Sequence, residues 1–158
     1  MNFRLLFFAL VLANCSMAAD RQNCPVTTPS DRRFVPPAPY SSSVGSHEFL
    51  YGSPALWTIV YPDWHVHSGG KLPFFRQGYD RTKDGRPRLT VVARRLDGQA
   101  PLVWNSLPGS GYTNGSLAGM FMNTGIDIPS SGCWEIAARY VDNPGNIGTL
   151  SYTVWVEP

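Results

Sequence analysis

Charged residues are scarce in this sequence. Asp, Glu, Lys and Arg make up 15% of its 158 residues, and the formal net charge is only +2. A chain with so few charges is neither a disordered acidic or basic tail nor a coiled coil. The small net charge also gives no reason to expect nucleic acid or an anionic membrane surface as a partner.

Helical periodicity and long apolar segments are missing as well. No stretch repeats apolar residues at helical spacing over three turns, and none is apolar for the roughly 18 residues that a membrane-spanning helix needs. Residues 5–13 are an apolar run that follows Arg4 and has the length of a signal-peptide core. We therefore expect no transmembrane segment and a signal peptide over residues 1–18, which would make the protein secreted or periplasmic. Residues 12–15 also resemble a bacterial lipobox, so the alternative is a membrane-anchored lipoprotein with its lipid on Cys15.

Cysteine is rare, with three in the chain. If Cys15 is removed or lipidated, Cys24 and Cys133 remain, and an oxidising compartment favours a disulfide between them. The alternatives are two unpaired buried thiols or a catalytic thiol. A catalytic thiol would need a basic partner, and no histidine lies near either cysteine in the sequence.

Proline and glycine are plentiful, with 14 and 15 residues, which indicates many short extended segments joined by turns. Prolines crowd the region after the signal peptide, and three serines follow them at residues 41–43. We expect residues 19–47 to be a Pro/Ser-rich extended arm that Cys24 fastens to the rest of the chain. Residues 48–158 should then form the folded domain.

Segments rich in β-branched and aromatic residues predict short strands. We expect them at residues 55–61, 89–96, 102–104, 119–122, 125–128, 133–140 and 150–156. Alternate residues of the last two segments should face the core, namely Trp134, Ile136, Ala138 and Tyr140, and Leu150, Tyr152, Val154 and Val156. The pattern predicts an all-β fold, an antiparallel β-sandwich that is immunoglobulin-like in the broad sense, with a small β-barrel as the alternative.

Several short motifs carry a resemblance to a known family. They are Cys24-Pro25-Val26-Thr27, residues 34–40, residues 51–58, residues 94–98 and Gly132-Cys133-Trp134-Glu135-Ile136. With these motifs the chain resembles an uncharacterised family of exported bacterial single-domain proteins that end in a Gly-Cys-Trp-Glu-Ile/Val strand hairpin. The resemblance implies a small secreted β-domain and brings no established activity. The chain departs from the pattern at Phe74-Phe75, where similar proteins tend to carry a Trp pair.

Histidines give one candidate metal site. From a strand, His65 and His67 would point the same way, and two imidazoles can hold a Cu or Zn ion, with His47 or Asp63 as a third ligand. The simpler interpretation is a solvated loop beside a turn.

Acidic residues give a candidate catalytic pair, because glycoside hydrolysis needs two carboxylates at a fixed separation. The candidates are Asp63, Asp80, Asp84, Asp97, Asp127, Glu135 and Asp142. Several occupy turn sequences, where the side chain bonds its own backbone, and Glu135 has arginines nearby with which to form a structural ion pair. The sequence contains no nucleophile elbow, phosphate loop or metalloprotease motif. We therefore expect no catalytic residues, no cofactor and no enzyme activity.

Aromatic and basic residues give the third candidate, a partner-binding surface. Its residues are Phe74, Phe75, Tyr79, Arg81 and Arg86, flanked by Trp64 and Trp155. Arginine and aromatic side chains often dominate the binding energy at interfaces. The alternative is that Phe74 and Phe75 close one end of the core.

The sequence thus predicts an exported, non-catalytic binding module of the bacterial cell envelope or extracellular space, whose partner is a protein or a cell-wall glycan. One alternative is a small metal-binding or hydrolytic envelope protein that uses His65 and His67. Another is a purely structural envelope protein.

Overall fold

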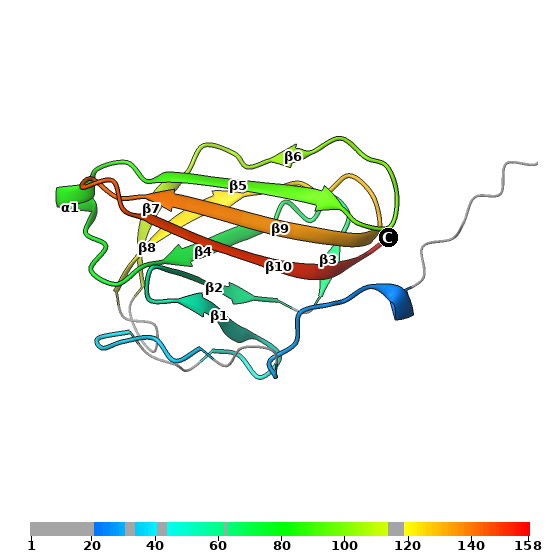
Figure 1. Ribbon diagram of the computed structural model, residues 1–158, viewed down its shortest axis with the longest axis horizontal. Helices are drawn as coiled ribbons and strands as arrows, with labels where there is room; N and C mark the ends of the chain where they lie inside the picture. Colours follow the sequence, from blue (N-terminus) through cyan, green and yellow to red (C-terminus); the bar gives the residue numbers. More distant parts are fainter. Residues whose placement is uncertain (1–20, 31–33, 41–43, 62, 114–118) are drawn as a thin grey trace, which may run out of the picture.

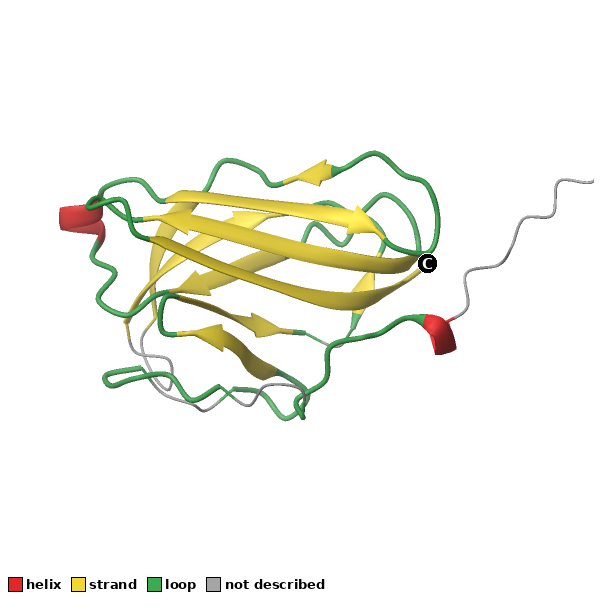
Figure 2. Cartoon of the chain, in the orientation of Figure 1, coloured by secondary structure: helices red, strands yellow, loops and turns green. Residues whose placement is uncertain are grey.

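Two five-stranded β-sheets pack face to face in the computed structural model (Figures 1 and 2). The structure describes residues 21–30, 34–40, 44–61, 63–113 and 119–158, without the side chains of residues 112, 113 and 119. Sheet A has the order β1-β2-β4-β8-β7, with strands Phe49–Ser53, Leu56–Val60, Lys71–Phe75, Gly119–Gly125 and Gly109–Thr113. Sheet B has the order β3-β10-β9-β5-β6, with strands Trp64–His65, Ile147–Glu157, Gly132–Val141, Arg88–Arg95 and Val103–Trp104.

Neighbouring strands are antiparallel except for β3, which runs parallel to the end of β10. The all-β antiparallel sandwich expected from the sequence is therefore confirmed. Helix in the described ranges is limited to the 3₁₀ turn η1 (Arg21–Asn23) and to α1 (Arg81–Asp84), a single turn. Within those ranges, no helix has the length and apolar character needed to cross a membrane.

Strands β9 and β10 form the hairpin predicted from their alternating sequences. Trp134 pairs with Val154, and every second residue of each strand is buried between the sheets, as predicted. The connection is a turn organised by Asp142, whose carboxylate accepts the N–H of Asn146 at 2.7 Å. Gly145 adopts a φ of +96°, which a side chain would disfavour.

The hydrophobic core has two parts, because both faces of sheet A are covered. Between the sheets, Phe74 and Met122 from sheet A meet Trp134 and Ile136 from sheet B, and all four are fully buried. On the outer face of sheet A a second cluster of buried residues contains Leu50, Trp57, Ile59 and Phe75.

The proline-rich arm covers this second cluster. The rings of Phe34 and Tyr40 lie 5.3 Å and 5.0 Å from the ring of Trp57, and the Tyr40 hydroxyl donates to the carbonyl oxygen of Arg76 at 3.1 Å. The described part of the arm thus closes the outer face of sheet A. The predicted signal peptide, including Cys15, lies outside the described residues.

A disulfide fastens the start of the arm to sheet B. Cys24 and Cys133 are bonded, as predicted, with 5.5 Å between their Cα atoms. The Thr27 N–H donates to the Thr153 carbonyl, and the Thr153 N–H donates to Thr27 Oγ1, both at 2.9 Å. The arm therefore pairs with the outer edge of β10 before it passes to sheet A.

Tyr152 carries a buried hydroxyl that has no hydrogen-bond partner in the described structure. Burial first, and the nearby Tyr61 second, raise the pKa of Tyr152, so the phenol remains neutral. A buried hydroxyl without a partner costs free energy, and phenylalanine keeps the ring without that hydroxyl. We expect Tyr152→Phe to leave the free energy of unfolding unchanged or to raise it by up to about 1 kcal/mol in chemical denaturation. A loss of more than about 1 kcal/mol would show that the hydroxyl is satisfied in solution.

The sequence did not predict β1, β3, β4 and β7. Strand β4 carries Pro73 in its middle, and β1 contains Gly52 at a φ of +134°, and both residue types are uncommon inside strands. A Cβ at Gly52 would lie 2.4 Å from the carbonyl oxygen of Leu56, so the close approach of β1 to β2 requires glycine. The strand predicted at residues 125–128 is wrong, because β8 ends at Gly125 and residues 126–128 run on as a loop.

Candidate functional site

The predicted aromatic surface is wrong, because its aromatic side chains are buried. Phe74 and Phe75 are 0% and 1% exposed, since one points between the sheets and the other points under the arm. Tyr79, Trp64 and Trp155 are also buried. A strand that is covered on both faces reads as a continuous apolar run, and the sequence alone does not reveal that the arm covers the outer face.

The two arginines predicted for that surface are exposed, but they lie on different segments of the chain. Arg81 lies on α1, and Arg86 lies in the segment that leads into β5. Arg76, by contrast, is a structural residue. Its guanidinium pairs with Asp84 at 3.2 Å and with Asp142 at 3.5 Å, and it lies 5.4 Å from the ring centre of Tyr140.

The candidate metal residues do not share a strand face. Strand β3 ends at His65, and His67 follows in a turn with a φ of +51°. His67 Nδ1 lies 3.2 Å from Asp127 Oδ1 at the surface. Within the described ranges, no three His, Cys, Asp or Glu side chains, His47 and Asp63 included, are arranged to hold a metal ion.

The ion pair predicted for Glu135 is present. Ser151 Oγ donates to Glu135 Oε1 at 2.8 Å, and Arg94 Nη2 lies 2.7 Å from Glu135 Oε2. The hydrogen bond from Ser151, together with Arg94, holds the pKa of Glu135 below its usual value. A general acid in glycoside hydrolysis needs a raised pKa, so this arrangement favours a permanently ionised, structural carboxylate.

Three further carboxylates stabilise turns. Burial acts to raise the pKa of Asp97, but hydrogen bonds from a neighbouring arginine and from a backbone N–H outweigh burial and leave the pKa below its usual value. Hydrogen bonds from Thr82 lower the pKa of Asp80, which caps α1, and hydrogen bonds from Asn146 lower that of Asp142. These three carboxylates therefore accept hydrogen bonds from groups within the protein itself.

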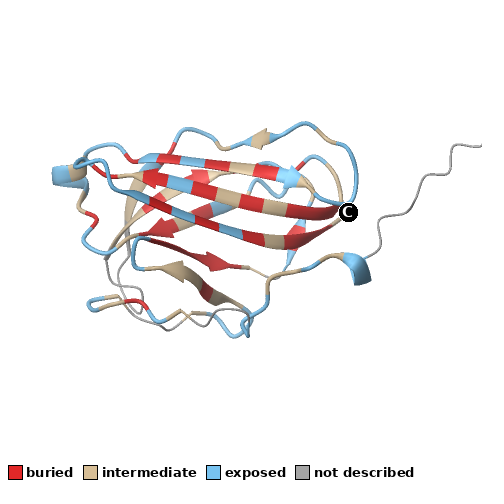
Figure 3. Ribbon diagram, viewed as in Figure 1, coloured by how far each residue is buried: buried red, intermediate tan, exposed pale blue. Residues whose placement is uncertain are grey.

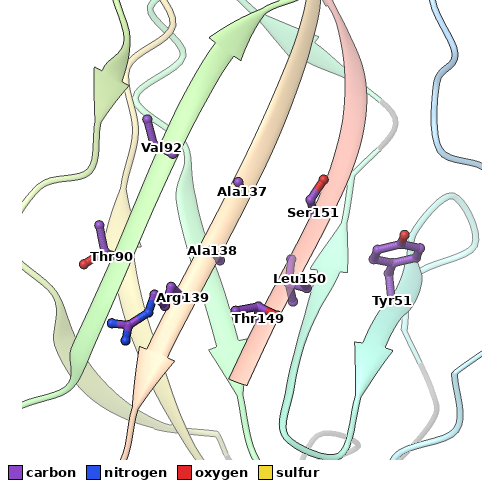
Figure 4. Close-up of a pocket in the computed structure, with 9 residues that line it drawn as sticks. All are labelled: Tyr51, Thr90, Val92, Ala137, Ala138, Arg139, Thr149, Leu150 and Ser151. Atoms are coloured by element: carbon purple, nitrogen blue, oxygen red, sulfur yellow. The ribbon is translucent and has the colours of Figure 1, made fainter. Parts of the chain in front are cut away.

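The outer face of sheet B is the open face of the sandwich. Buried and exposed residues alternate along β5, β9 and β10, as Figure 3 shows by colour. The strand register sets the outward residues in rows: Thr90, Arg139 and Thr149 in one, and Val92, Ala137 and Ser151 in the next. Figure 4 shows these side chains on the three strands, with Tyr51 of β1 beyond the edge of β10.

These rows form the floor of a shallow groove with a volume of about 730 Å³. A second groove of about 440 Å³ adjoins it, because Thr90 and Arg139 line both. The second groove adds Arg86, Arg88 and Leu107. We call the two grooves together the sheet B trough.

The trough is positively charged. Arg86, Arg88 and Arg139 line it, and no carboxylate does. Arg86 Nε donates to the Pro108 carbonyl at 3.3 Å, and Arg88 Nε donates to the Val141 carbonyl at 3.2 Å. Among the residues described, none of the three arginines has an acidic partner. Their terminal guanidinium nitrogens therefore remain open to a ligand.

An exposed tryptophan borders the trough. Trp104 of β6 is directly opposite Val92 of β5, so its side chain shares the outer face, and 60% of it is exposed. Leu107, in the loop between β6 and β7, is also exposed. The sequence predicts that Arg139 points outward, but it gives no sign that Arg139 lies near Arg88, because only the pairing of β5 with β9 brings them together.

No family model, curated protein or solved structure matches this chain. The resemblance to exported bacterial proteins therefore stays a prediction.

Proposed function

We propose that this protein is an exported, non-catalytic binding module of the bacterial cell envelope or extracellular space, and that the sheet B trough is its ligand surface. The observation that carries the proposal is the set of three trough arginines without acidic partners. Among the described residues, Arg139 has no carboxylate partner, and it lies within strand β9 and not at a helix end, so its guanidinium can form charge-assisted hydrogen bonds with an anion.

Two features support export. The apolar segment at residues 5–13 follows a positive residue, as in a signal peptide. The Cys24–Cys133 disulfide is suited to an oxidising compartment.

The state of the carboxylates supports binding rather than catalysis. Glu135, Asp97, Asp80 and Asp142 have lowered pKa values and are hydrogen-bonded within the fold. The general acid of a glycoside hydrolase needs a raised pKa, so these four carboxylates fit a structural role.

A charge-reversal variant tests the proposal. Thr90→Glu together with Thr149→Glu places a carboxylate on each side of Arg139, because both threonines are paired with it in the register. We expect the mature parent protein to sediment with the cell-envelope fraction of the organism that makes it, and the double variant to remain in the supernatant.

The matched control is Gln77→Glu together with Gln99→Glu, which adds the same charge at exposed positions outside the trough. It should sediment as the parent does. Equal sedimentation of the trough variant and the parent would place the binding surface elsewhere. Failure of the parent to sediment at all would contradict an envelope ligand for the trough.

A further inference from the structure

We infer that the ligand of the sheet B trough is an anionic glycan, a sugar chain that carries carboxylates or phosphates. The inference rests on the proposed function of the trough, and it adds the class of ligand. Three features of the trough support it: its charge, its hydroxyl-rich floor and its aromatic border.

The charge of the trough calls for an anion. A guanidinium binds carboxylate and phosphate through paired N–H donors, and such charge-assisted hydrogen bonds are stronger than neutral ones. Arg88 lies on β5, Arg139 lies on β9 and Arg86 lies in the loop before β5, and all three line the second groove, while Arg139 lines the first groove as well. Three guanidinium groups at one end of the trough fit a ligand that carries more than one anionic group.

The floor of the trough suits a polar chain. Apart from Arg139 its outward side chains are small, and Thr90 and Thr149 place hydroxyl groups on the outer face, as does Ser151, whose hydroxyl donates to Glu135. A threonine or serine hydroxyl can both donate and accept a hydrogen bond, so it can bond to a sugar hydroxyl in either direction. Ala137 at the centre leaves room for a ligand to lie flat across β9.

Trp104, at the border of the trough, supplies an apolar surface on which a sugar ring can pack. The C–H-bearing face of a pyranose ring packs on an aromatic ring, and an exposed Trp offers the largest such surface among the side chains. Trp104 is two strands across from Ala137, and Arg139 is one two-residue step along, which separates the Cα atoms of Trp104 and Arg139 by roughly 12 Å. A short acidic oligosaccharide can contact both residues at once.

A protein partner fits this face less well. Protein interfaces gain most of their energy from large side chains inserted into desolvated pockets. The floor of the trough is shallow and, apart from Arg139, made of small side chains, so it offers no such pocket. An acidic polypeptide would use the arginines but would have no use for the aromatic border.

Calorimetric titration of the mature protein tests the inference with defined probes. The probes are polygalacturonate oligomers for carboxylate, phosphorylated mannan oligomers for phosphate, dextran as a neutral glycan, and polyglutamate as an acidic polypeptide. We expect at least one anionic glycan to bind, with an affinity that falls as salt is raised, and dextran and polyglutamate to bind at least tenfold more weakly. The probe that binds, carboxylate or phosphate, identifies the source of the charge.

Three variants locate the site. Arg139→Gln and Trp104→Ala should each weaken binding of the anionic glycan by roughly tenfold or more, because one removes a charged hydrogen bond and the other removes the apolar surface. Arg81→Gln is the matched control, since Arg81 is exposed on α1, has no acidic partner in the described structure and does not line the trough. It should bind as the parent does.

Several results would overturn the inference. Polyglutamate could bind as tightly as the anionic glycan, or dextran could bind more tightly than the anionic glycan. Trp104→Ala could bind the anionic glycan with unchanged affinity, or neither anionic glycan could bind at all. If the inference fails while Thr90→Glu/Thr149→Glu still abolishes envelope sedimentation, the proposed function stands with a ligand of another class. If the variant sediments normally, the proposed function fails as well.

Discussion

Loss of the Cys24–Cys133 disulfide should lower the free energy of unfolding by roughly 4–5 kcal/mol. The two cysteines are 109 positions apart, and a crosslink that closes so long a loop removes a large conformational entropy from the unfolded chain. The bond also holds the start of the arm, whose rings cover Trp57 on sheet A. The variant Cys133→Ser, measured by urea denaturation, should show this loss.

Two controls accompany the disulfide variant. Cys24→Ser should lose as much stability as Cys133→Ser, and the double variant should lose no more than either, because each removes the same bond. Thiol titration of the denatured mature protein, without reductant, should find neither cysteine free. Two reactive thiols in that titration would contradict the disulfide.

Replacement of Trp134 by alanine should cost roughly 3–5 kcal/mol. Trp134 is 0% exposed, faces Val154 across the hairpin, and its Nε1 donates to the Ser130 carbonyl at 3.0 Å. The substitution removes this hydrogen bond and leaves a large cavity between the sheets, and chemical denaturation measures the loss.

Trp104→Ala is the matched control for Trp134→Ala. Because Trp104 is mostly exposed, its loss should change the free energy of unfolding by no more than about 0.5 kcal/mol. A change below about 1 kcal/mol for Trp134→Ala would contradict its place in the core.

The sequence predicted sheet B better than sheet A, because only sheet B has one face exposed to solvent. Strands β5, β9 and β10 have one buried and one exposed face, so their residues alternate and the inward faces can be assigned directly. Sheet A is covered by sheet B on one side and by the arm on the other. Its strands therefore lack alternation, and Phe74 and Phe75 resembled an exposed aromatic pair.

The trough could not be predicted from the sequence, because it depends on strand register. Arg88 and Arg139 lie in separate regions of the chain, and they meet only because Arg88 pairs with Val141 and Thr90 pairs with Arg139. The formal net charge of +2 also conceals the cluster. Acidic residues elsewhere balance the total, yet they form ion pairs with other arginines, such as Arg94 with Glu135.

The most direct measurement of the central claim, that the outer face of sheet B binds the ligand, is a map of amide chemical-shift changes in the labelled mature protein. The titrant is the soluble polysaccharide released from the envelope fraction with which the protein sediments. We predict that the shifts concentrate at Thr90, Val92, Ala137, Arg139 and Ser151, with the Trp104 indole among them. Shifts confined to the arm and the outer side of sheet A, or to His65 and His67, would contradict the claim.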